Sequence, residues 1–169
     1  MKIIPAQTEH LSQISEIYQF YILNSIATFR KAQDGLVEIE SFFKDQQRRS
    51  LPFLVAIDGE KVIGYSYLYP YKKEFSGYNP TFYDTIYIHP DHLGKGIGKQ
   101  LLESIILEAK ANPKIQNIIS IIAVEKDEDL NASMALHQKF GFTVVGRMIE
   151  VGYKLGRSID VVNMQLQFK

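Results

Sequence analysis

The sequence predicts a mixed α/β domain in which helices pack on a central sheet, and two observations support this prediction. Segments with apolar residues at three- and four-residue spacing, typical of helices, alternate with shorter β-branched and aromatic runs, typical of strands. Three alternating glycines, within residues 94–98, stand between a predicted strand and a predicted helix. The resulting order is strand, two helices, three strands, helix, strand, helix and two strands, which fits an α/β or α+β arrangement.

Before the glycine-rich stretch, the pattern predicts four strands and two helices. Thr8 is expected to cap the first helix, which begins at Glu9. Asp58-Gly59 is a turn signal that joins the runs on either side into a hairpin. The other predicted elements are strands at 2–5, 52–57, 61–69 and 81–88, a helix at 37–49, and loops at 24–35 and 72–80.

After the glycines, the pattern predicts two helices and three strands. The first helix runs to Ala111. Residues 117–124 form a nearly continuous apolar run, which is typical of a strand buried on both faces. A helix at 130–140 is expected to end at Gly141, and strands at 143–151 and 159–167 close the chain.

Length and composition limit the class of protein. The 169 residues suit one domain, 1–169, with a sizeable core. Lys and Arg number 19, as do Asp and Glu, so no net charge draws the chain to nucleic acid or to an anionic membrane, and we expect neither as a partner. The absence of Cys excludes disulfides and a cysteine nucleophile, and the four His residues lack the spacing of metal ligands, so no metal is expected.

The N-terminal sequence and the apolar runs bear on location. Residues 1–5 lack the apolar segment of a secretion signal. No apolar run reaches the length needed to span a membrane. We therefore expect a cytoplasmic protein.

The glycine-rich stretch predicts a site for a phosphate or diphosphate. Glycine lets backbone N–H groups turn toward one point and lets a ligand approach closely. The start of a helix adds unpaired donors and a partial positive charge, and Lys95 and Lys99 stand nearby. The alternatives fit less well, because Gln100 follows Gly98-Lys99 where a Walker loop needs Ser or Thr, and the glycine spacing is not that of a dinucleotide fingerprint.

Several motifs resemble the GNAT acetyltransferases. Residues 89–98, His-Pro-Asp-His-Leu-Gly-Lys-Gly-Ile-Gly, look like the acetyl-CoA motif of that family. Residues 132–142, which end in Gly-Phe, are similar to its next motif, and His137 stands where many members have Tyr. That histidine, Thr28-Phe29 and residues 152–160 resemble the phosphinothricin acetyltransferase-like branch. The resemblance implies a GNAT fold, with a central mixed, mostly antiparallel sheet flanked by helices.

The resemblance also implies an acetyl-CoA-dependent N-acetyltransferase and the residues that hold acetyl-CoA. The central strand would hold the acetyl carbonyl and the pantetheine arm, and the loop amides would hold the diphosphate. The implied residues are Ile86, Tyr87 and Ile88 on the strand, Leu93, Gly94, Lys95, Gly96, Ile97, Gly98 and Lys99 in the loop, and Asn131, which also suits a helix cap.

The resemblance implies direct attack of an amine on the thioester, and it places the candidate catalytic residues. His137 is expected to carry a proton to or from the reacting groups, or else to be structural. The family's carboxylate on the central strand aligns with Tyr83, which is not acidic. Asp84 is a candidate base only if a bulge turns it to the same face, and a water chain is the alternative.

The branch implies a small amine acceptor, such as an amino acid or an analogue. The candidate substrate-binding residues are Thr28, Phe29, Lys72, Lys73, Tyr78 and Tyr153. Lysine lacks the two-pronged guanidinium by which arginine grips a carboxylate, so specificity for phosphinothricin does not follow from Lys72 and Lys73. Tyr65, Tyr67, Tyr69 and Tyr71 alternate on one strand face, either as packing or as a pocket wall.

Other functions remain open from sequence alone. The chain could be an acyl-CoA-binding module without catalysis, because Tyr83, Leu93 and Leu130 depart from the family pattern. It could also acetylate a protein or peptide, which would call for an acidic groove. The branch further implies a homodimer, with the C-terminal strands as contact surface.

Overall fold

The computed structural model describes residues 1–30 and 35–168, and it confirms the mixed α/β fold. Over these residues the sheet has seven strands in the order β1-β2-β3-β4-β5-β7-β6, and the β4–β5 pair is the parallel one in an otherwise antiparallel sheet. The strands are β1 Lys2–Pro5, β2 Phe53–Asp58, β3 Lys61–Pro70, β4 Thr81–Ile88, β5 Asn117–Val124, β6 Thr143–Lys154 and β7 Arg157–Gln167.

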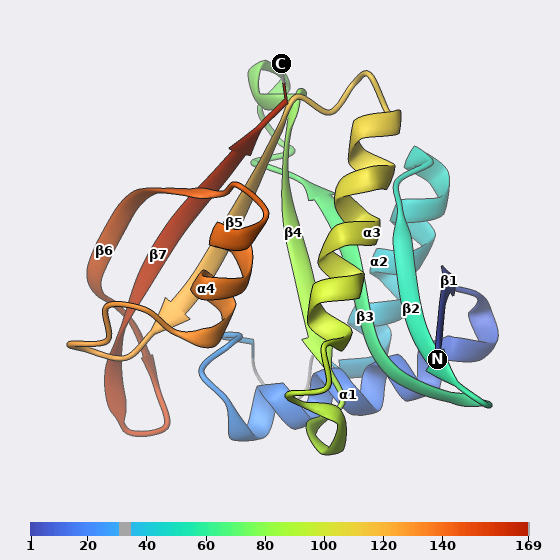
Figure 1. Ribbon diagram of the computed structural model, residues 1–169, viewed down its shortest axis with the longest axis horizontal. Coiled ribbons are helices and arrows are strands. Elements are labelled where there is room, and N and C mark those ends of the chain that lie inside the picture. The colour runs from blue at the N-terminus through green and yellow to red at the C-terminus, as the bar shows by residue number, and fades with distance from the viewer. Residues whose placement is uncertain (31–34, 169) are drawn as a thin grey trace.

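Helices cover both faces of the sheet (Figure 1). The longer helices are α1 Leu11–Asn24, α2 Gly35–Arg49, α3 Ile97–Ala111 and α4 Ala132–Lys139, and short 3-10 turns are η1 Thr8–His10, η3 Ser76–Tyr78 and η4 Pro90–His92. One core cluster joins α1 and α2 to β2 and β3, and it contains Tyr65, Tyr67 and Tyr69. The other joins α3 and α4 to β4, β5 and β7. Within the described residues, no helix is both long and apolar enough to cross a membrane.

The fork between β4 and β5 is the feature that positions the site. The two strands pair only from Thr81–Tyr83 to Asn117–Ile119 and then diverge (Figure 1). β5 continues beside β7 over its whole length, while β4 stays beside β3. From residue 84 to residue 88, β4 therefore has no strand on its β5 side. Its backbone groups there can meet a ligand, except the Ile88 carbonyl, which accepts a hydrogen bond from the Tyr21 hydroxyl at 2.7 Å.

Two predicted helix starts are wrong. Thr8 does not cap α1, because the His10 side chain accepts a hydrogen bond from the Gln7 N–H at 2.9 Å and closes a separate 3-10 turn first. α1 begins only at Leu11. The last helix begins at Ala132 rather than residue 130, because the Asn131 side chain caps it by accepting from the Met134 N–H at 2.9 Å.

The prediction that β5 is buried on both faces is also wrong. Ile118, Ser120 and Ile122 are buried, but Ile121 on the other face is 51% exposed. The core cluster beneath α1 and α2 contains no residue of β5, so these helices do not cover that face. The exposed face of β5 borders the fork and is available to a ligand.

The β6–β7 hairpin carries a bulge at one edge of the sheet. The pairing slips between Met148 and Gly152, and Glu150 has a φ of 51°. Asp160, only 2% exposed, accepts a hydrogen bond from the Glu150 N–H at 2.7 Å and so stabilises the bulge. Several apolar side chains of β6 are exposed, namely Val144, Val145, Met148, Ile149 and Val151.

Candidate active site

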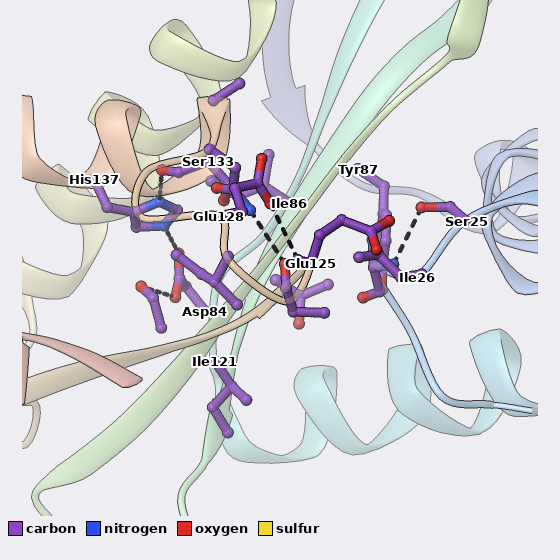
Figure 2. A pocket seen from close by; sticks show the side chains of 17 residues that line it. Ser25, Ile26, Asp84, Ile86, Tyr87, Ile121, Glu125, Glu128, Ser133 and His137 are labelled. Carbon is purple, nitrogen blue, oxygen red and sulfur yellow. Dashed lines mark hydrogen bonds and ion pairs between the residues drawn. The ribbon is translucent and has the colours of Figure 1, made fainter. Parts of the chain in front are cut away.

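Three side chains meet where the fork opens. Asp84 is the first residue of β4 beyond the parallel pairing, and the hydroxyl of Ser120 on β5 donates to its Oδ1 at 2.6 Å. His137 of α4 places Nε2 2.9 Å from Asp84 Oδ2 (Figure 2). Ser120 and His137 are 2% and 4% exposed. The three side chains thus form a buried network between the two strands and α4.

The partners of His137 fix where its protons lie. Nδ1 is 2.7 Å from the carbonyl oxygen of Ser133, which can only accept, so Nδ1 carries a proton. A second proton must lie between Nε2 and Asp84. Burial alone would lower the pKa of His137, but the hydrogen bond and charge of Asp84 outweigh it and raise that pKa. His137 is therefore suited to hold and donate a proton, and neither ring nitrogen is free to accept one.

Tyr83 and Asp84 lie on opposite faces of β4. The pairing of β4 with β3 keeps one register from Phe82 to Ile88, so no bulge turns Asp84 to the face of Tyr83. Tyr83 packs on Tyr69 with ring centroids 5.4 Å apart. Burial raises the pKa of Tyr83 to about 12, so the phenol stays protonated at neutral pH and offers no base.

The glycine loop leads from η4 into α3 with the geometry that a diphosphate site needs. Gly94 and Gly96 have φ angles of 73° and 77°, a conformation that favours glycine, and Gly96 is the N-cap of α3. A Cβ on either would meet no atom within 4 Å, so the space above them is open. The first N–H groups of α3 point out of its N-terminus toward that space and have no helical acceptors.

Two cavities meet at His137. The glycine-loop cavity, of about 510 Å³, lies between residues 92–99 and α4. The fork cavity, of about 450 Å³, lies between β4, β5, residues 25–27 and the β5–α4 segment, as Figure 2 shows. The residues that line both are Ile86, Ala132, Ser133 and His137. A ligand that crosses from one cavity to the other would pass the His137–Asp84 pair.

Comparisons with known proteins agree with this geometry. The model of the acetyltransferase (GNAT) family matches residues 14–142. The phosphinothricin N-acetyltransferase of Alcaligenes faecalis is 34% identical over 93% of this chain and 77% of its own length. The L-amino acid N-acyltransferase MnaT of Escherichia coli is 32% identical over 99% of this chain and 94% of its own. A putative acetyltransferase from Salmonella typhimurium, yncA, solved with its cofactor acetyl-CoA, aligns with a TM-score of 0.91 and 31% identity over 99% of this chain and 93% of that one.

The chain belongs to the GNAT acetyltransferase family. The expected family, branch, fold and enzyme class, an N-acetyltransferase, are confirmed. GNAT acetyltransferases use acetyl-CoA as co-substrate, and the open glycine loop of this chain fits the diphosphate of that molecule.

The structure places most predicted cofactor residues of this GNAT enzyme around the two cavities. Ile86 lies between them, Tyr87 lines the fork cavity, and Ile88 lines the glycine-loop cavity. Asn131 lines the fork cavity as well as capping α4, and its Nδ2 donates to the Ala123 carbonyl at 3.1 Å. The loop residues on the glycine-loop cavity are Leu93, Gly94, Gly96, Ile97, Gly98 and Lys99. Lys95 lines neither cavity, and its ammonium donates to the Asp91 carbonyl.

The predicted substrate residues of this enzyme fall into two groups. Lys72 lies over the Tyr71 and Tyr78 rings, and Lys73 donates to the Tyr69 hydroxyl at 2.6 Å. Lys72, Lys73 and Tyr78 lie in the loop that precedes β4, and they line neither of the two cavities. Thr28 and Phe29, by contrast, follow the segment that lines the fork cavity and contact the β6–β7 hairpin. Tyr153 of that hairpin is 74% exposed.

Sequence analysis missed two features of this site. Ser120 supports Asp84, and the signal was a serine within an otherwise apolar strand. Lys154 ties the hairpin to the segment after α1, which no local pattern indicates. Within the part of the chain that the structure describes, no group of three or more His, Asp or Glu is arranged to hold a metal, and the expected absence of one stays a prediction.

Proposed function

We propose that this enzyme transfers the acetyl group of acetyl-CoA to the primary amine of an amino acid or a close analogue. The observation that carries the proposal is the buried His137–Asp84–Ser120 network at the junction of two cavities. The names of the relatives, a phosphinothricin and an L-amino acid N-acyltransferase, support this substrate class.

In this proposal the glycine loop holds acetyl-CoA. The amides from Leu93 to Lys99 and the N-terminus of α3 bind its diphosphate, and the free edge of β4 from Ile86 to Ile88 meets the pantetheine arm. Lys99 adds positive charge, and Asn131 faces the same ligand from α4. When bound, acetyl-CoA supplies the acetyl group as a thioester.

His137 is proposed as the residue that holds the catalytic proton. Asp84 and the Ser133 carbonyl keep its ring protonated and fix the ring plane. To protonate a departing thiolate, the Nε2 proton would leave its hydrogen bond with Asp84, and Nδ1 would keep its proton on the Ser133 carbonyl. Asp84 serves as its charge partner, since both carboxylate oxygens are engaged, one by His137 and one by Ser120. Water remains the candidate acceptor of the amine's proton, since Tyr83 stays protonated.

The acceptor amine is proposed to enter the fork cavity from the side of residues 25–29. Glu128 lines this cavity and would attract an ammonium group, whereas the Glu125 carboxylate beside it is already paired with Arg157. Thr28 and Phe29 follow the segment that lines this side of the cavity, and Tyr153 is next to Gly152, on which Phe29 packs. That Lys72, Lys73 and Tyr78 contact the acceptor stays a prediction, and any such contact would lie outside the two cavities, since they line neither.

Thiol release from acetyl-CoA tests the proposal. The panel comprises L-amino acids, methionine sulfoximine, phosphinothricin, polyamines and short peptides. We expect turnover with one or more free amino acids or analogues, and none with peptides. Binding of acetyl-CoA by calorimetry without turnover on any amine would instead favour the acyl-CoA-binding module, and turnover on peptides alone would favour a protein acetyltransferase.

A homodimer through β6 is part of the proposal. β6 lies at one edge of the sheet and exposes Val145, Met148, Ile149 and Val151. A long edge strand with exposed apolar side chains is prone to pair with another chain, and a second copy offers the same strand for a two-fold contact. Light scattering should report a dimer for the wild type and a monomer for Ile149→Glu, whereas a monomeric wild type would contradict the proposal. A cytoplasmic location stays a prediction.

A further inference from the structure

The β6–β7 hairpin contacts two segments that border the fork cavity. The segment after α1, residues 25–29, contributes Ser25, Ile26 and Ala27 to the cavity wall. The segment between β5 and α4, residues 125–131, contributes Glu125, Glu128 and Asn131. Because these segments are far apart in the chain, the space between them depends on what connects them in the fold.

Two arginines of the hairpin hold the β5–α4 segment. Arg147 donates from Nη1 to the Glu128 carbonyl at 2.9 Å and from Nη2 to the Glu125 carbonyl at 3.3 Å. Its Nε donates to the buried Asp160 at 2.9 Å, which fixes the guanidinium. Arg157 pairs with the Glu125 carboxylate through two hydrogen bonds of 2.8 and 2.5 Å. This segment is thus tied to the hairpin by both main chain and side chain.

Lys154 holds the other segment. Its ammonium donates to the Thr28 carbonyl at 2.5 Å and to the Tyr21 carbonyl at 3.1 Å. Tyr21 lies in the last turn of α1, where the carbonyl groups attract a cation. Burial lowers the pKa of Lys154. One side chain of the hairpin therefore connects the end of α1 with residue 28.

Gly152 makes room for Phe29 beside this lysine. A Cβ at position 152 would lie 2.4 Å from Phe29 Cζ and 2.5 Å from Cε1, closer than any real contact. The Phe29 ring therefore packs directly on the hairpin backbone. The carbonyl of Thr28 and the ring of Phe29 are held by hairpin residues only two positions apart.

We propose that Lys154 is a positioning residue for the acceptor: it fixes residues 25–29 against the hairpin and so sets the width of the acceptor entrance. The proposal rests on the proposed function, because it treats this segment as the acceptor wall. Lys154 lines neither cavity, and its two hydrogen bonds go to main-chain carbonyls, so it does not touch the reacting atoms. Tyr21 also lines the glycine-loop cavity, but it is fixed there separately, because it lies within α1 and its hydroxyl donates to the Ile88 carbonyl at 2.7 Å. We therefore expect the loss of Lys154 to act on residues 25–29 and on acceptor recognition.

Lys154→Met tests this role, because methionine keeps much of the side chain's length and removes the ammonium. We expect the acceptor KM to rise about tenfold, the scale of a lost charge-assisted hydrogen bond, while the KM for acetyl-CoA stays unchanged. Amides of residues 25–30 should exchange hydrogen faster. Lys154→Arg, which keeps a cation, should recover part of both effects.

Lys126→Met is the matched control. Lys126 belongs to the β5–α4 segment but lines neither cavity, and it forms an exposed ion pair with Glu150 in the bulge of the same hairpin. Unlike Lys154, it therefore does not attach the segment after α1. Lys126→Met should match the wild type in the acceptor KM and in amide hydrogen exchange at residues 25–30. The comparison separates the loss of one lysine charge from the loss of the specific attachment at Thr28 and Tyr21.

Three results would overturn the proposal. The first is an acceptor KM in Lys154→Met equal to that of the wild type. The second is an equal rise in the KM values for acceptor and acetyl-CoA, which would mark a general structural role. The third is unchanged amide exchange at residues 25–30. If the wild type acetylates no amine, the proposed function fails, and the exchange measurement still decides whether Lys154 holds the segment.

Discussion

The glycine-loop cavity and the acceptor side of the fork cavity are assembled in different ways. The first takes its diphosphate-binding groups from one stretch of main chain, residues 93–99, at the start of α3. The second joins residues 25–29, the fork and the β6–β7 hairpin through side chains such as Lys154. The donor site is thus encoded locally and the acceptor site by distant contacts, so substitutions on the two sides should affect different kinetic constants.

The largest effect is expected at His137, which borders both cavities. His137→Gln can still hydrogen-bond Asp84 but cannot carry a titrating proton, so kcat should fall roughly 100-fold. Calorimetry should show little change in acetyl-CoA affinity. His89→Gln is the control, because His89 lines neither of the two cavities and should give wild-type turnover. An unchanged kcat in His137→Gln would make His137 structural.

The next largest effect should be confined to the donor side. Gly96→Val places a β-branched residue at a φ of 77° and displaces the loop amides, so acetyl-CoA affinity should fall roughly 50-fold. Gly59→Val shares the positive φ of 61° and the open surroundings but lies in the β2–β3 turn. It should lower stability without weakening acetyl-CoA binding. Equal loss of affinity in both variants would refute the placement of the diphosphate.

A smaller effect is expected on the acceptor side. Gly152→Ala forces the Phe29 ring to move, because the new Cβ would otherwise lie 2.4 Å from it. We expect the acceptor KM to rise about fivefold and the KM for acetyl-CoA to stay constant. Steady-state kinetics with each substrate varied in turn would measure this. Gly146→Ala, at another β6 glycine whose Cβ would meet nothing within 4 Å, is the control.

Asp84→Asn is expected to have the smallest effect on kcat at neutral pH, a fall of about threefold. Its main effect should be to shift the pH dependence of kcat. Asp84 raises the pKa of His137, and an acid works only below its own pKa. The kcat of the wild type should therefore decline as pH rises through that raised pKa. Without the carboxylate the pKa falls, so the decline should begin at lower pH. Ser120→Ala keeps the negative charge of Asp84 and should shift the pH dependence of kcat less. If the decline of kcat at alkaline pH did not move in Asp84→Asn, His137 would be excluded as the acid.

The contrast between the two sides also explains what could be predicted from sequence. The glycine loop and its strand and helix have local signals, and β4 and the end of α3 lie where they were expected. His137 was found through a short motif on one helix. Ser120 and Lys154 were missed because their partners, Asp84, Tyr21 and Thr28, are distant in the chain.

The errors in the fold have the same origin. An apolar run such as residues 117–124 predicts a strand, but whether a helix covers its second face depends on where α1 and α2 pack. The cap of α1 was misplaced because the side chain of His10, rather than the hydroxyl of Thr8, bonds the chain at that turn.

The short β4–β5 pairing has a mechanical consequence. Within the residues that the structure describes, β1–β4 and β5–β7–β6 share backbone hydrogen bonds only around residues 80–83 and 116–119. The domain thus resembles two half-sheets joined by a narrow seam. Acetyl-CoA bound between β4 and β5 would contact both half-sheets and so hold them together. Its binding should therefore raise the melting temperature of the protein as well as prepare the reaction.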